Sequence, residues 1–189
     1  MDAQELLAEA IRCDGAAQQA LLRGDVARAG SLFRAAAERY RASWEAAPPR
    51  SFGRLVGLLK ASILAGDGGH DAAYVRRALG ESCDSPPACY ALALAALAQG
   101  DDEAALPAIA GMRAGDEAFA RTAEAMAALV HGDADGYAAA VEAIVADFAA
   151  RERHLTGVPF ADTAVVLERL AAPRGLAARP ASSLMPVLG

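Results

Sequence analysis

Aromatic residues are scarce in this chain of 189 residues: they make up 5% of it, although 54% of its residues are hydrophobic. Much of the apolar content is alanine, which is the strongest helix former and lets helices approach one another closely. No window alternates apolar and polar residues over the length that a strand needs. The composition therefore excludes a core built on many large rings and predicts an all-α protein with closely spaced helices.

Long apolar runs and an export signal are also missing. The longest uncharged apolar run, 88–98, is far shorter than the roughly 20 residues that a membrane span needs. Asp2 and Glu5 stand where a secretory signal carries positive charge. Cys13, Cys83 and Cys89 are odd in number, which predicts free thiols in a reducing compartment. We therefore expect a soluble cytoplasmic protein that does not enter a membrane.

The chain has no excess of positive charge. Its formal net charge is −6, which argues against general binding to nucleic acid or to acidic membranes. The charge is uneven, with a basic stretch over 23–60 and an acid-rich stretch over 101–147. One interpretation is that these are only solvated helix faces. The other is that the acids meet a partner, and the candidate binding residues are then Asp101, Asp102, Glu103, Asp116 and Glu117.

Four Gly-Asp pairs, each closing an alanine- or leucine-rich stretch, organise the chain. Glycine ends helices in the left-handed conformation, and aspartate is a preferred N-cap for the next helix. The spacings of 42, 34 and 32 residues lie in the range of helical repeat arrays. The sequence thus predicts four helical hairpins, whose turns lie at Gly24-Asp25, Gly66-Asp67, Gly100-Asp101 and Gly132-Asp133.

The expected domain is a single helical-repeat unit over 1–172, followed by an extended tail over 173–189. A ninth helix without a partner should cap the array, and Leu184, Met185 and Leu188 should pin the tail. Cys13 and Cys89 are read as small buried apolar residues of their helices. The expected helices are 2–23, 26–47, 52–64, 71–81, 88–99, 103–113, 116–131, 134–154 and 160–172.

Two segments resemble the tetratricopeptide repeat, in which an alanine follows the turn glycine by five residues. Ala29 and Ala105 fit this pattern, whereas Asp71 and Tyr137 depart from it. The resemblance implies an irregular superhelix of hairpins with a concave groove that binds peptides or protein partners.

The last sixty residues resemble the bacterial immunity protein 49 family of polymorphic toxin systems. The resemblance is carried by Asp133-Ala134-Asp135-Gly136-Tyr137, Arg151-Glu152-Arg153-His154, Val158-Pro159-Phe160 and Ser183-Leu184-Met185-Pro186. It implies a cytoplasmic protein that binds and neutralises a toxin domain.

Motifs that would indicate catalysis or a cofactor are weak. Cys83 and Cys89 do not have the spacing of a zinc site. The segment 67–71 resembles a flexible turn with Asp71 as the N-cap more than a phosphate or calcium loop. We therefore expect no enzyme activity, no metal and no cofactor.

The hypothesis that follows is a non-catalytic module that binds a protein or peptide. Two alternatives stay open: a scaffold or regulatory subunit, and a small-molecule binder or enzyme with a cavity between helices. Gly53 and Gly57, four residues apart on a crowded apolar helix, motivate the cavity alternative. Tyr90 and Phe119 are either groove residues or core fillers.

Overall fold

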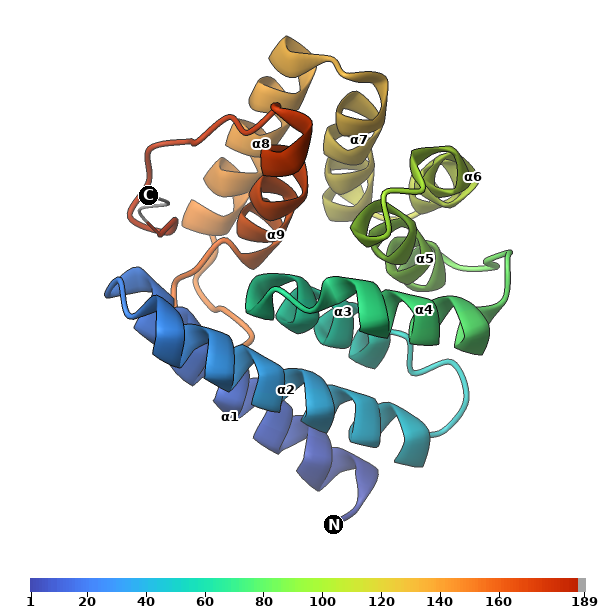
Figure 1. Cartoon of the computed structure of the whole chain (residues 1–189), viewed down its shortest axis with the longest axis vertical. Helices are drawn as coiled ribbons and strands as arrows, with labels where there is room; N and C mark the ends of the chain where they lie inside the picture. Colours follow the sequence, from blue (N-terminus) through green and yellow to red (C-terminus); the bar gives the residue numbers. More distant parts are fainter. Residues whose placement is uncertain (187–189) are drawn as a thin grey trace.

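The computed structural model describes residues 1–186, and within this range the regular structure is entirely helical (Figure 1). The expectation of an all-α protein is therefore confirmed. Within the same range, no helix is both long and apolar enough to cross a membrane. The helices are α1 (Ala3–Leu22), α2 (Val26–Ala46), α3 (Gly53–Ala65), α4 (Gly68–Leu79), α5 (Pro86–Ala98), α6 (Asp102–Met112), α7 (Glu117–His131), α8 (Ala134–Ala149) and α9 (Asp162–Ala171), followed by a short 3-10 helix (Ala172–Arg174).

The four Gly-Asp pairs lie at turns between helices, as predicted. Each of the four glycines has a positive φ, between 69° and 90°, which an L side chain rarely adopts. Asp25, Asp101 and Asp133 accept a hydrogen bond from a backbone N–H of the following helix, as N-caps do. Asp67 makes no such bond, and its carboxylate instead receives a 2.8 Å hydrogen bond from Arg34 Nε.

Consecutive helices from α1 to α8 pack on one another, and the close approaches use small residues. Helix α5 is buried on every side, from Ala88 to Leu97. A Cβ placed on Gly57 of α3 would lie 2.7 Å from the ring of Tyr40, so α2 packs directly against the α3 backbone there. Scarce large side chains thus fill the spaces that alanine and glycine leave.

Helix α9 packs on α3 as well as on α7 and α8, so it bridges the second hairpin and the last one (Figure 1). It was expected to cover only the end of the array. Its buried residues include Ala164, Val166, Leu167 and Glu168, which together span its circumference. The helix is therefore an interior element, buried on several sides.

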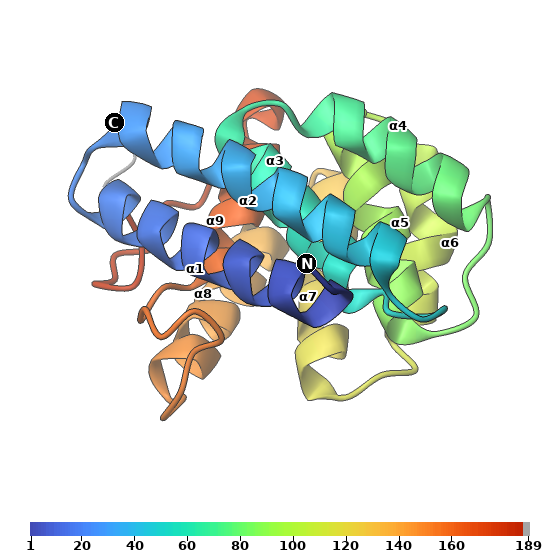
Figure 2. The ribbon, with the colours of Figure 1, turned by 90° about the horizontal axis from the view of Figure 1, so that it is seen from below.

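The loop between α8 and α9 returns to the first helix (Figure 2). The hydroxyl of Thr156 donates a 2.6 Å hydrogen bond to Gln18 Oε1 of α1. Gly15 lies within α1, and a Cβ placed on it would lie 3.1 Å from the Thr156 carbonyl oxygen. These contacts join residues about 140 positions apart in the sequence.

Several expected helix ends differ in the structure. Helix α4 begins at Gly68, and Asp71 lies within its first turn, where it accepts a 2.6 Å hydrogen bond from Ser62. Helix α8 ends at Ala149, so the residues up to His154 belong to the following loop. For α4, the contact of Asp71 with Ser62 takes the place of the expected N-cap.

The cysteine expectation was wrong for two of the three residues. Cys83, in the loop before α5, and Cys89, in the first turns of α5, form a disulfide with their Cα atoms 5.1 Å apart. Cys13 is free and half-buried. The six-residue separation, which does not suit a zinc site, brings the two sulfur atoms together because the chain turns at Ser85 to start the helix.

The tail is fixed by a buried carboxylate. Both oxygens of Glu168, a residue that is 1% exposed, accept backbone hydrogen bonds: Oε1 from Ala178 and Oε2 from Arg179. Leu184 and Met185 are buried, as expected, and the carbonyl of Leu184 accepts from the Ala161 N–H. The predicted contact of Leu188 lies outside the described residues.

Candidate functional site

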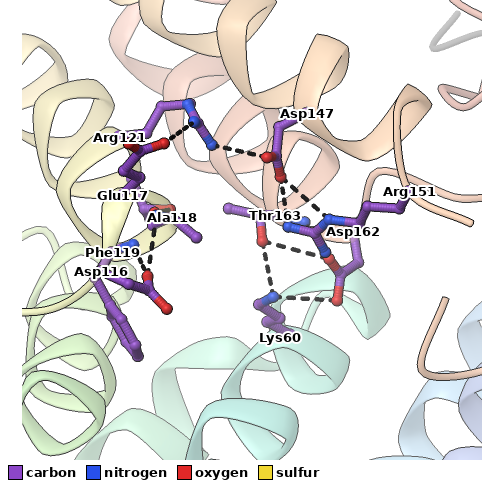
Figure 3. Close-up of polar contacts among 11 residues, drawn as sticks. Lys60, Asp116, Glu117, Ala118, Phe119, Arg121, Asp147, Arg151, Asp162 and Thr163 are labelled. Carbon is purple, nitrogen blue, oxygen red and sulfur yellow. Dashed lines mark hydrogen bonds and ion pairs between the residues drawn. The ribbon is translucent and has the colours of Figure 1, made fainter. Parts of the chain in front are cut away.

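A cavity of about 440 Å³ lies between helices α1, α3, α5, α7, α8 and α9 and the α8–α9 loop. We call it the interhelical cavity. Its volume falls in the range of roughly 300–1,000 Å³ that is typical of ligand pockets. The polar side chains that surround it come from elements far apart in the sequence (Figure 3). Its charged lining residues are Asp14, Lys60, Asp116, Arg121, Asp147, Arg151 and Asp162.

Lys60 is the only lysine of the chain, among 18 basic residues, and it points into this cavity. Its Nζ donates to Asp162 Oδ2 at 3.1 Å and to Thr163 Oγ1 at 2.9 Å, at the start of α9 (Figure 3). Burial alone would lower the pKa of Lys60, but the Asp162 carboxylate and the Tyr90 hydroxyl raise it above its ordinary value. Lys60 therefore stays a cation throughout the physiological pH range.

A second charged cluster joins α7 to the end of α8. Asp147 accepts from Arg151, at 2.6 Å to Nη2, and forms a 3.1 Å ion pair with Arg121 Nη1 (Figure 3). The guanidinium of Arg151 also stacks over the ring of Phe148, with its carbon 3.7 Å from the ring centroid. One carboxylate thus interacts with two cations, and Asp116 and Glu117 add negative charge on the same side of the cavity.

Asp14 lies at the α1 side of the cavity and is buried. Its two oxygens accept from Tyr40 Oη at 3.1 Å and from Gln18 Nε2 at 3.0 Å. Burial, with a smaller contribution from the Asp162 carboxylate, raises the pKa of Asp14 to about 7. Asp14 therefore changes charge near neutral pH, inside a network that reaches Thr156 through Gln18.

The remaining walls of the cavity are largely apolar and aromatic. Tyr90 and Phe119 form an edge-to-face pair with centroids 6.2 Å apart, and both line the cavity. The buried hydroxyl of Tyr90 and Nδ1 of His154 have no hydrogen-bond partner within residues 1–186. The other apolar lining residues include Val56, Ile144, Phe148, Leu155, Val158 and Phe160. Polar groups thus converge on an apolar space, as in binding pockets.

The five predicted acids do not form one patch. Asp101 pairs with Arg76 at 2.8 Å, and Asp102 pairs with Arg174 of the C-terminal segment, whereas Glu103 is exposed. These three residues begin α6, and α6 extends about 16 Å from them toward α7.

The other two predicted acids lie at the interhelical cavity. Asp116 lines it and accepts from the N–H groups of Ala118 and Phe119 as the N-cap of α7 (Figure 3). Glu117 is almost fully exposed and lies 3.9 Å from Arg121 Nη2. The structure therefore brings Asp116 and Glu117 to the edge of the cavity and separates them from the acids of α6.

The most polar residues of the cavity were not singled out from the sequence. Lys60, Asp147 and Asp162 meet only because α3, α8 and α9 converge. One signal was available: a single lysine within the apolar helix 52–64 of a chain that otherwise uses arginine. Of the two glycines that motivated the cavity alternative, Gly53 lines this cavity, whereas Gly57 packs against the ring of Tyr40.

Comparison with known proteins identifies no relative: no family model matches the chain, and neither the curated proteins nor the solved structures contain a match.

Proposed function

We propose that this chain is a non-catalytic, tetratricopeptide-like binding protein that holds a protein partner at the open edge of the interhelical cavity. The observation that carries the proposal is Leu155, which is 77% exposed and lines the cavity. It stands in the α8–α9 loop, between the cavity and solvent. Leu155 extends the apolar wall of the cavity to its opening, and an apolar centre with a polar rim is the usual composition of a protein–protein interface.

Charged residues at the same cavity support this assignment. Asp116, Asp147 and Arg151 line the same cavity, and Glu117 projects from the first turn of α7. A second cavity of about 400 Å³ shares Leu155 and continues toward α1. A partner segment seated there would contact both cavities.

Capture of partners from the native cell lysate tests the proposal. The tagged wild-type chain is compared with Leu155→Asp and with Val26→Asp, a matched control because Val26 is an exposed large apolar residue at the start of α2. We expect the wild type and the Val26 variant to retain one stoichiometric partner and the Leu155 variant to lose most of it. Equal recovery by all three baits would contradict the site.

The finer form of the proposal is an immunity protein whose acids meet a basic surface of a toxin domain, since charge complementarity steers association. Asp116→Asn with Glu117→Gln should then weaken capture of a toxin-like partner. The control is the set Asp101→Asn, Asp102→Asn and Glu103→Gln on α6. A partner that is a functionally linked enzyme would instead favour a scaffold or regulatory subunit.

A further inference from the structure

The loop between α4 and α5 is held in place by few interactions besides the Cys83–Cys89 disulfide. Among the described residues, no backbone–backbone hydrogen bond involves positions 81–84. Asp84 of this loop pairs with Arg50, but the two side chains are 65% and 62% exposed. Exposed ion pairs of this kind contribute little to stability. The disulfide is therefore the strongest link between the loop and the helices.

The two sulfur atoms of the disulfide have different surroundings. Cys89 is 2% exposed, and a Cβ placed on Gly111 of α6 would lie 2.5 Å from its Sγ. Cys83 is half-buried, and its neighbours Ser82 and Asp84 are exposed. An attacking thiolate can therefore reach Cys83 Sγ, whereas Cys89 Sγ lies against the α6 backbone. Exposed disulfides are the ones that exchange readily with thiols.

Cleavage of the disulfide would move Cys83 rather than Cys89. Two sulfur atoms that are not bonded need more space between them than the two atoms of a disulfide. Cys89 has no room to retreat, because α5 is buried on every side and α6 packs against the sulfur. Cys83 instead borders a cavity of about 370 Å³, here called the Trp44 cavity, which Trp44, Phe52 and Leu79 also line. The loop would therefore shift at the edge of this cavity.

We propose that the Cys83–Cys89 disulfide is a reversible redox switch, which holds the α4–α5 loop against the Trp44 cavity when oxidised and releases the loop when reduced. The reductant is a dithiol. One of its thiolates attacks Cys83 Sγ, the S–S bond breaks, and the electron pair of that bond leaves on Cys89 Sγ, which takes up a proton. The second thiolate of the reductant then attacks the reductant's own sulfur in the mixed disulfide, and Cys83 leaves and is protonated. The cysteine pair thus gains two electrons and two protons, and the reductant becomes a disulfide.

Digestion of the folded chain with a glutamate-specific protease tests the proposal. Glu81 is exposed in the α4–α5 loop, and Glu152, exposed in the α8–α9 loop, is the internal control. Dithiothreitol should make two further thiols, beyond that of Cys13, available for alkylation and leave the circular dichroism of the helices unchanged. Cleavage after Glu81 should then become about tenfold faster, because proteases cut exposed and mobile loops, whereas cleavage after Glu152 should stay constant. Oxidised glutathione should restore slow cleavage after Glu81.

Two cysteine variants and the single tryptophan locate the switch. Cys83→Ser should be cleaved quickly after Glu81 with or without dithiothreitol, whereas Cys13→Ser should respond as the wild type does. The fluorescence emission of Trp44 should change with the same dependence on dithiothreitol as the cleavage. Reduction that occurs only when the helices unfold, or reduction that leaves cleavage after Glu81 unchanged, would overturn the proposal. Neither outcome depends on whether Leu155→Asp loses a protein partner, since no residue of 80–85 lines the interhelical cavity.

Discussion

Asp14 and Lys60 show how burial acts on single side chains of this protein. Both lie at the same cavity, and the Asp162 carboxylate raises the pKa of each. For Lys60 the higher pKa keeps the charged form, which Asp162 neutralises. For Asp14 the higher pKa favours the uncharged form, mainly because burial disfavours the charged carboxylate and secondly because the Asp162 carboxylate is near. The two residues therefore respond to pH in different ways.

The raised pKa of Asp14 predicts a stability that falls as pH rises. The unfolded chain loses this proton near pH 4 and the folded chain near pH 7, so the folded state binds more protons in between. The free energy of unfolding should therefore decline between about pH 4 and 7, by at most about 4 kcal/mol from this group. Asp14→Asn should remove that decline. Urea unfolding at several pH values measures it, and parallel curves for both proteins would contradict the assignment.

Glu168 is the buried residue with the most hydrogen bonds to distant parts of the chain. Besides the two tail amides, it accepts a 2.9 Å hydrogen bond from Tyr137 Oη. Tyr137 and Asp71 depart from the alanine pattern of the repeat, and both make buried or half-buried polar contacts, with Glu168 and with Ser62. Tyr137 thus makes a contact outside its own hairpin, with α9, whereas Asp71 makes one within the second hairpin, with α3.

Glu168→Gln should release the tail without unfolding the helices. In the variant, the side-chain amide replaces one carboxylate oxygen by an NH₂ group, which cannot accept a hydrogen bond. One of the two backbone N–H groups, of Ala178 or Arg179, then loses its acceptor, which costs about 1–3 kcal/mol of stability. Hydrogen exchange at Ala178 and Arg179 should accelerate. The control is Glu142→Gln on the exposed side of α8. Unchanged exchange in the Glu168 variant would show that other contacts hold the tail.

At the scale of the helices, the contact between α2 and α3 depends on one missing side chain. A Cβ on Gly57 would lie 2.7–2.9 Å from three ring atoms of Tyr40, whereas a Cβ on Gly53 would meet nothing within 4 Å. The two glycines lie four residues apart on the same helix and have different tertiary contexts. Only the structure distinguishes a packing glycine from one that borders a cavity.

Gly57→Ala should therefore destabilise the protein by about 1–3 kcal/mol, because the Tyr40 ring must shift and its bond to Asp14 is strained. Gly53→Ala should be neutral or stabilising by up to about 1 kcal/mol, since alanine favours the helix. Thermal unfolding of the two variants compares them directly. A Gly57 variant as stable as the Gly53 variant would contradict the close approach.

For the whole molecule, the turns were predictable, whereas most of the residues that line the cavity were not. The signal for a turn spans a few residues, so Gly24-Asp25 and Gly100-Asp101 could be read locally. The cavity instead joins α1 to α9, and the position of α9 depends on contacts with α3 that no local pattern encodes. Sequence proximity was also misleading for the acids, because Glu103 lies in the first turn of α6 and the length of this helix separates it from Asp116.

The central claim is that the interhelical cavity and its edge form the binding site, and hydrogen exchange of the chain with and without its captured partner tests it most directly. The account predicts protection at the start of α7, the end of α8 and the α8–α9 loop, over 116–122 and 147–163. Protection confined to α2 and α4, which do not line that cavity, would contradict it.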